Sequence, residues 1–397
     1  MQSGISGNPV SAAVPERLHA LDSLRAVAMF LGIVLHATLA YTTLPVLWAV
    51  QDAYESRGFD TLIGFIHGFR MQVFFFIAGF FGHLLWQREG WRSFLAQRWQ
   101  RVGIPFVVGM LTIVPLFLLL YVWSYSRPDT GLPGEMPIAK SILEYPTAHL
   151  WFLEILLMLY AGIALIAWCG SRVSGTRTLQ RIDVFFDRFM LHPLKPLLML
   201  PPTLLLLWDG PLLGEVDING MLLLPSVQAV VYYGLFFTVG WWLHRRIHLL
   251  HILQHWMKSY FFVATLAYFT LGACYDLHMQ PDAPGFFAMK TVALMAAALY
   301  SWTMTFAVTG LFLRIASGHR PLMRYLADAS YWCYLMHLPI VVFLQIALVS
   351  WQVNGWLKFL LIVVITMLVL LPSYHWLVRY TWIGQTLNGP RHRSKHG

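Results

Sequence analysis

Leu21-Asp22-Ser23-Leu24-Arg25 opens a long apolar stretch that continues to His36, and this stretch decides the fold. Arg25 and His36 are 11 residues apart. At roughly 100° per residue this is about three helical turns, so both side chains project from one face, about 16 Å apart along the axis. An ionisable group in a membrane helix costs on the order of 2.5–3.5 kcal/mol, so such groups face the protein interior and serve function. We therefore expect a first membrane helix with Asp22, Arg25 and His36 on a functional stripe.

The composition is that of a membrane protein. Of the 397 residues, 58% are hydrophobic and only 11% are charged, whereas a soluble domain carries about 25% charged residues. Apolar runs close to the ~20 residues that a helix needs to cross a bilayer recur along the chain. Barrel strands would be shorter and would alternate apolar with polar residues. The sequence predicts an all-α, polytopic membrane bundle.

About ten transmembrane helices are expected in this bundle. The fifth is short and contains Pro196, Pro201 and Pro202, which kink or break a helix. The predicted spans are 20–43, 60–86, 102–124, 149–169, 194–209, 223–243, 259–275, 287–313, 327–350 and 356–379.

The distribution of charge predicts the topology. Most of the 27 Lys and Arg residues lie on one side if the spans alternate, and such a bias marks the cytoplasmic side. Both termini are then cytoplasmic, and the net charge of +9 reflects membrane topology, with no nucleic-acid partner. We expect a cytoplasmic segment over 1–18, a transmembrane domain over 19–380 and a basic cytoplasmic tail over 381–397.

The second span carries two further ionisable residues, His67 and Arg70, which share a helix face at a spacing of three. Counted from the predicted inner ends, Arg70 reaches about the same depth as His36. A functional contact between the two spans is one interpretation. A buried polar pair that only ties two helices together is the other.

Five other residues, in three separate segments, could take part in chemistry. Arg98 and Arg101 lie where the third span begins, and the planar guanidinium fork suits phosphate, although ordinary positive-inside charge explains them too. His149 and Glu154 open the fourth span, and His337 lies deep in the ninth. Each of these could instead be an interfacial or packing residue.

A histidine-rich loop offers a weak alternative site. His244, His248, His251 and His255 have spacings of 4, 3 and 4, which would stack them on one helical face. No Cys or carboxylate joins them as zinc ligands would, and the neighbouring Arg245 and Arg246 repel cations. We expect no metal site.

Together these pieces resemble the membrane acyltransferase 3 family. Its pattern is a first-span Arg followed eleven residues later by His, then an Arg-containing second span ending in Phe-Phe-x-x-Ser-Gly-Phe, an Arg-x-x-Arg-x-x-x-Pro junction and a late Ser-x-x-x-Tyr-Leu-x-His span. Ala78 stands where the family usually has Ser. The matching residues here are Arg25 and His36; Arg70 with Phe75–Phe80; Arg98, Arg101 and Pro105; and Ser330, Tyr334, Leu335 and His337.

Within the family, the segments Phe65–Phe75 and His149–Leu153 are similar to members that succinylate osmoregulated periplasmic glucans in the bacterial inner membrane. The resemblance implies a multi-pass acyltransferase that moves an acyl group, succinyl or acetyl, from cytosolic acyl-CoA to a glucan hydroxyl outside. It implies no permanently bound cofactor. Membrane lipids and glucan synthase machinery are further expected partners.

The expected mechanism assigns a role to each candidate residue. His36 takes the proton of the attacking hydroxyl or carries the acyl group transiently, and Arg70 stabilises the oxyanion. A transporter or flippase for a glucan or lipid-linked sugar, and a scaffold for a glucan synthase, remain alternatives. Arg25, Arg98 and Arg101 hold CoA, and Asp22, His67, His149, Glu154 and His337 shape the acceptor side or orient His36.

Overall fold

The computed structural model describes residues 13–132, 147–173, 176–210, 214–220, 224–276, 284–318 and 320–389. Within these ranges the regular structure is helical, and an isolated bridge between Asn219 and Pro225 is the one β-type pairing. Most of the predicted 1–18 segment and residues 390–397 of the predicted tail lie outside the described residues. The all-α prediction therefore holds throughout the described chain.

Nine long helices and four short ones make up most of the described chain. One π-helical turn, Trp99–Gly103, follows α2, and another, Tyr374–Val378, follows α13. The long helices are α1 (Ala13–Thr38), α2 (Arg57–Arg98), α3 (Ile104–Tyr125), α5 (Trp151–Val173), α9 (Val227–Arg245), α10 (Leu250–Asp276), α11 (Phe286–Ile315), α12 (Pro321–Leu348) and α13 (Gly355–Ser373). The short ones are α6 (Thr176–Leu191), α7 (Lys195–Leu198), α8 (Leu200–Leu207) and α14 (Trp382–Asn388).

Six helical segments of the described chain are long and apolar enough to cross a membrane, as a membrane helical bundle requires. Arg57–Tyr125 holds two of the predicted spans, because α2 runs into α3 through the π-helical turn. The predicted spans 223–243 and 259–275 form α9 and α10, which fall outside this group, so ten crossing helices are not confirmed. The six segments are His19–Tyr41, Arg57–Tyr125, Ala148–Cys169, Phe286–Ile315, Pro321–Leu348 and Gly355–Val378.

The fifth predicted span, in which the three prolines favoured a bent or interfacial segment, is divided into two short helices, and it is not confirmed as a membrane-crossing helix. Residues 194–209 form α7 and α8, of 4 and 8 residues, which are far shorter than the ~20 residues that cross a bilayer. Pro196, Pro201 and Pro202 lie in the first turns of these two helices, and Pro lacks the N–H that a continuing helix would need.

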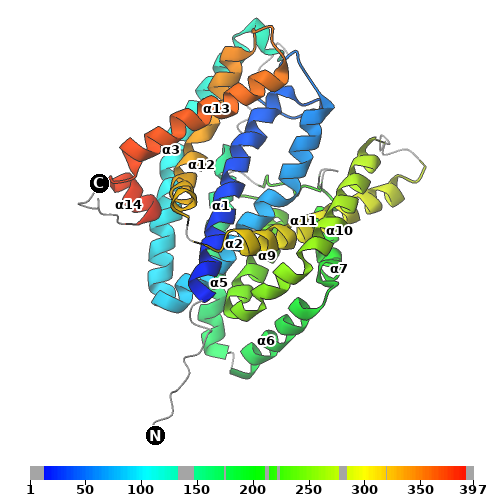
Figure 1. Ribbon diagram of the computed structural model, residues 1–397, viewed down its shortest axis with the longest axis vertical. Helices are drawn as coiled ribbons and strands as arrows, with labels where there is room; N and C mark the ends of the chain where they lie inside the picture. The colour runs from blue at the N-terminus through cyan, green and yellow to red at the C-terminus, as the bar shows by residue number, and fades with distance from the viewer. Residues whose placement is uncertain are drawn as a thin grey trace.

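Helix α1 runs through the middle of the molecule, beside α2 and α12 (Figure 1). Glycines also bring the backbones of α2 and α9 into direct contact. A Cβ on Gly79 would lie 1.9 Å from the carbonyl oxygen of Phe237, and one on Gly240 would lie 1.8 Å from that of Phe76. Small residues at such crossings let two helices approach closely. Helix α9 therefore packs tightly against α2 around Gly79.

We name the two ends of the bundle by their residues. The basic end holds Arg25 of the first half of α1, Arg98 at the end of α2, and Arg101 in the π-helical turn that follows. The loop end holds segment 42–56, which joins α1 to α2. The two ends differ in polarity: the basic end gathers arginines, whereas ion pairs and backbone hydrogen bonds fasten the loop end.

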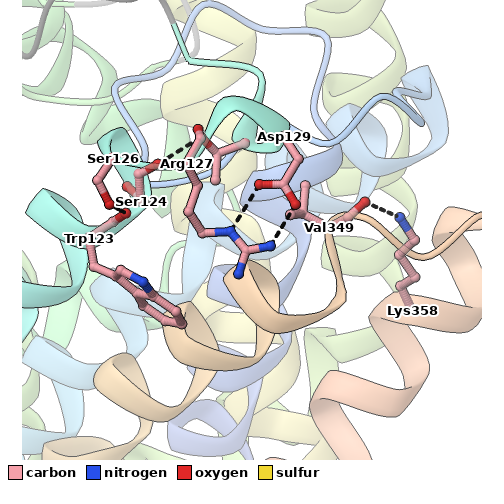
Figure 2. A network of polar contacts seen from close by, with 8 residues as sticks. Trp123, Ser124, Ser126, Arg127, Asp129, Val349 and Lys358 are labelled. Atoms are coloured by element: carbon pink, nitrogen blue, oxygen red, sulfur yellow. Dashed lines mark hydrogen bonds and ion pairs between the residues drawn. The ribbon is translucent and has the colours of Figure 1, made fainter.

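A buried ion pair fastens segment 42–56 to α13. Lys358 Nζ lies 2.7 Å from Asp52, both side chains are 3% exposed, and the same amine donates to the carbonyl oxygen of Val349 at 3.1 Å. Figure 2 shows Lys358 reaching Val349, beside the bidentate pair of Arg127 and Asp129. The loop end is thus held by several specific polar contacts.

Candidate active site

Three histidines from distant parts of the chain meet in the middle of the bundle. His36 comes from the end of α1, His149 from the 3-10 turn Ala148–Leu150 and His337 from α12. His36 Nδ1 lies 2.8 Å from His337 Nε2, and the ring centroids of His149 and His337 are 5.2 Å apart. The structure therefore joins three of the predicted residues into one cluster.

The local backbone turns His149 into this cluster. Ala148 has a φ of +47°, the one positive φ of a non-glycine residue in the described ranges, and such conformations tend to occur at functional sites. His149 Nε2–H donates to the carbonyl oxygen of Leu335 at 3.1 Å. That carbonyl lacks its helical donor because the residue four positions on is Pro339, which has no N–H.

The hydrogen bonds determine which nitrogen of each ring carries the proton. His337 Nδ1 lies 2.6 Å from the carbonyl oxygen of Tyr334, which can only accept, so Nδ1 is the donor. In the neutral ring His337 Nε2 is then an acceptor, and it receives the Nδ1–H of His36. This leaves Nε2 of His36 with a free lone pair, as a general base requires.

Arg70 completes the cluster from α2. Its side chain is buried, and its Nε has no hydrogen-bond partner among the residues that the structure describes. A Cβ on Gly32 would lie 2.3 Å from a terminal guanidinium nitrogen of Arg70. The guanidinium therefore packs directly on the backbone of α1, one turn before His36, in space that only a glycine leaves open.

Trp48 and Gln345 hold His36 from the loop end. The indole of Trp48 stacks on the His36 ring, with the planes within 2° and the centroids 5.8 Å apart. Its Nε1–H donates to Gln345 at 2.9 Å, and the Gln345 amide donates to the carbonyl oxygen of His36 at 3.0 Å. Sequence reasoning missed both residues, because a Trp near a membrane surface is ordinary anchoring and a lone Gln gives no pattern.

The cluster surrounds a cavity of about 400 Å³, which we call the histidine cavity. Four of the predicted site residues line it together, and aromatic and methionine side chains complete its wall. Its lining residues are Met29, His36, Arg70, Met71, Phe74, His149, Trp151, Phe152, Tyr334 and His337.

A second cavity, of about 940 Å³, lies toward the basic end and is named the arginine cavity. Arg25, Arg98 and Arg101 all line it, as the phosphate-binding prediction requires. The guanidinium of Arg98 lies 5.1 Å from the Tyr160 ring centroid. Ala78 also lines this cavity, so the hydroxyl that the family usually places there is absent.

The two cavities share three wall residues: Met29, Phe74 and Phe152. Met29 follows Arg25 by four residues and precedes His36 by seven, so these three side chains form one stripe along α1. A ligand with a charged head among the arginines could therefore extend an uncharged arm past Met29 to His36.

Three predicted residues lie outside both cavities. Asp22 pairs with Arg25 at 3.1 Å at the basic end, and His67 lies 3.3 Å from Glu215. Glu154 lines neither cavity. The spacing along a helix did not predict these contacts, because two residues on one helix can face different neighbouring segments. Arg70 faces α1, whereas His67 contacts the segment before α9.

The histidine-rich loop does not form one helical face. Arg246 has non-helical angles, so α9 ends at Arg245 and α10 begins at Leu250. His244 instead faces His83 of α2, with their Nδ1 atoms 2.7 Å apart. Arg245 and Arg246 pair with Asp183 and Asp187 of α6, which anchors this amphipathic helix on α9.

Comparison with known proteins identifies the family of the chain. The profile of a family described as an acyltransferase domain matches residues 18–375, so the chain belongs to this acyltransferase family. It is 28% identical over 380 residues to Glucans biosynthesis protein C of Escherichia coli O1:K1 / APEC, covering 93% of both chains. The protein of the same name from Escherichia coli strain K12 / DH10B is 28% identical over 384 residues, again with 93% of both covered. No solved structure matches the chain.

Proposed function

We propose that this protein is a multi-pass O-acyltransferase of the bacterial inner membrane that moves an acyl group from cytosolic acyl-CoA to hydroxyls of periplasmic glucan. Succinyl is the acyl group that the resemblance favours. Both termini are cytoplasmic in this proposal, so the basic end faces the donor and the loop end faces the acceptor. The name of the E. coli relatives supports the glucan, and the bias of Lys and Arg supports the orientation.

One observation carries the proposal: the arginine cavity and the histidine cavity share Met29, Phe74 and Phe152. The phosphates of CoA need cationic partners at the basic end, where Arg25, Arg98 and Arg101 gather. The thioester must reach a base, and His36 stands about 16 Å further along α1. In this proposal phosphate binding and thioester chemistry occur in two adjoining cavities, and the acyl arm runs past the three side chains that the cavities share.

In the proposed reaction a glucan hydroxyl oxygen attacks the thioester carbonyl carbon. His36 Nε2 takes the hydroxyl proton as the C–O bond forms. The C–S bond then breaks, and the proton passes to the CoA thiolate. His337 Nε2, which accepts from His36 Nδ1 at 2.8 Å, holds the imidazole in the required tautomer and supports its positive charge, as a third group does in a catalytic triad.

A transient acyl-His36 uses the same nitrogen. In that route Nε2 attacks the thioester carbonyl carbon, the C–S bond breaks, and CoA leaves as the thiolate while the acyl-imidazolium keeps its Nδ1–H. In the second step the glucan hydroxyl oxygen attacks the acyl carbon, the C–N bond breaks, and the hydroxyl proton passes through the freed Nε2 to the thiolate. Both routes pass through a tetrahedral carbon whose oxygen becomes negative. Arg70, with a buried Nε that no other group occupies, is the donor for this oxyanion, a role worth about 2.7–4 kcal/mol for one well-aimed donor.

The test uses purified protein in liposomes, with labelled acyl-CoA on the side of the basic end and glucan on the other. The wild type should transfer label to glucan, and His36→Ala should lose transfer while still binding CoA. His255→Ala is the matched control, because His255 is an exposed histidine of α10 that lines neither the histidine cavity nor the arginine cavity.

Glucan movement without labelling would instead support the transporter, and unimpaired acylation by His36→Ala would refute the mechanism. Substitutions at Arg25 and His36 that leave glucan synthesis intact would point to the scaffold. Mass spectrometry of the labelled glucan identifies the acyl group, since succinyl and acetyl products differ in mass and charge.

A further inference from the structure

A third cavity, of about 740 Å³, opens at the basic end between the start of α1 and the start of α12, and we call it the α12 cavity. Sequence reasoning treated Arg320 and Arg324, two of its arginines, only as topological charge. Its lining residues are His19, Asp22, Ser23, Arg25, Gly318, Arg320, Met323, Arg324, Ala327 and Asp328.

The lining of this cavity favours an anion. Basic side chains outnumber the acidic ones, Asp22 and Asp328, and Asp22 already pairs with Arg25. Arg320 precedes α12 with an extended backbone and Arg324 lies in the first turn of the helix, and both residues line the cavity. The first turn of α12 adds the positive end of the helix dipole at the same place. These are features of a phosphate site rather than of a dispersed positive surface.

The α12 cavity adjoins the arginine cavity. Arg25, Ala327 and Asp328 line both of them. The three cavities therefore follow one another, from the α12 cavity through the arginine cavity to the histidine cavity. A ligand that fills the arginine cavity can place a second charged group on the far side of Arg25.

We propose that the α12 cavity binds the phosphate on the 3′ position of the donor's ribose, with Arg320 and Arg324 as its ligands. The inference rests on the proposed function. CoA carries a diphosphate and, separated from it by the ribose, a single 3′-phosphate. The diphosphate lies at Arg98 and Arg101 in the arginine cavity, and the ribose spans the junction, where the Asp328 carboxylate can accept from its 2′-hydroxyl. A planar guanidinium binds two phosphate oxygens at once.

This assignment makes a distinctive prediction about the donor. Dephospho-CoA lacks the 3′-phosphate and keeps every other group, so it should bind the wild type more weakly than CoA does. Arg320→Ala with Arg324→Ala should weaken CoA roughly tenfold to hundredfold, the range for losing one or two charge-assisted hydrogen bonds. The same double variant should bind dephospho-CoA as the wild type does.

The experiment measures the Kd of CoA and of dephospho-CoA by calorimetry on purified protein in neutral detergent, without turnover. Arg314→Ala is the matched control, because Arg314 is an exposed arginine at the end of α11 that lines none of the three cavities. Repeating the titrations with added phosphatidylglycerol tests the other source of phosphate. A lipid headgroup that occupies the α12 cavity would compete with CoA in the wild type and not in the double variant.

Loss of CoA affinity in the double variant with dephospho-CoA unaffected supports the proposal. Equal weakening of both ligands, or of neither, overturns it and leaves the acyltransferase assignment standing. Competition by phosphatidylglycerol together with equal affinity for CoA and dephospho-CoA would assign the cavity to lipid. A wild type that binds neither nucleotide would refute the CoA donor itself, so failure of the two proposals is distinguishable.

Discussion

Gly32→Ala probes the contact on which the arrangement of Arg70 depends. The new Cβ would lie 2.3 Å from a terminal nitrogen of Arg70 and 3.6 Å from its central carbon, so the guanidinium must move away from α1. Forcing a methyl group into a packed interior costs about 1–3 kcal/mol. The displaced guanidinium no longer faces the reacting carbonyl beside His36, and loss of one oxyanion donor lowers kcat by about 10²–10³.

The assay is acyl transfer from labelled acyl-CoA to glucan in liposomes, with kcat and KM determined separately. We expect a large fall in kcat with little change in the KM for acyl-CoA, because the arginines proposed to bind the CoA phosphates lie in a different cavity. Gly162→Ala is the matched control: it is also a glycine within a long helix, and a Cβ there meets nothing within 4 Å. It should leave kcat unchanged.

A double-mutant cycle with Arg70→Ala decides whether Gly32 acts through Arg70. If it does, Gly32→Ala adds little to the loss that Arg70→Ala causes alone. The reasoning would be refuted if the fall in kcat of the double variant equalled the product of the two single falls. A normal kcat in a folded Gly32→Ala variant would also refute it.

Two further predictions concern the groups around His36. His337→Ala should lower kcat by about 10²–10⁴, the usual contribution of assisted proton transfer. His337→Gln should recover part of the lost kcat, because the amide oxygen can accept a hydrogen bond from His36. Equal activity of the two variants in the transfer assay would count against the proposed tautomer. Lys358→Met leaves the buried carboxylate of Asp52 unpaired and should destabilise the protein by about 3–5 kcal/mol, seen as a lower Tm. Asp52→Asn in the same chain should restore most of that loss, and a Tm that stays low would show that the ion pair is not the cause.

Sequence reasoning was strongest where one helix carried the whole signal. Arg25 and His36 lie on α1, so helical periodicity alone placed them on one stripe. The same reasoning found Arg98 and Arg101, which adjoin each other in the chain and line one cavity. For residues 194–209 the three prolines correctly indicated an interrupted helix, which the structure divides into α7 and α8. Sequence reasoning was wrong for the four histidines, because the break after Arg245 could not be read from their spacing.

The sequence by itself determined a helical membrane protein, the stripe on α1 and the membership of an acyltransferase family, because composition, periodicity and motifs are local properties of the chain. Only the tertiary structure decided that His337, 301 residues away, supports His36 while His67 turns to Glu215. Trp48 and Gln345 were likewise invisible before folding. The physical reason is that a catalytic geometry depends on how helices rotate and cross, which is set by packing between distant segments rather than by the pattern within any one of them.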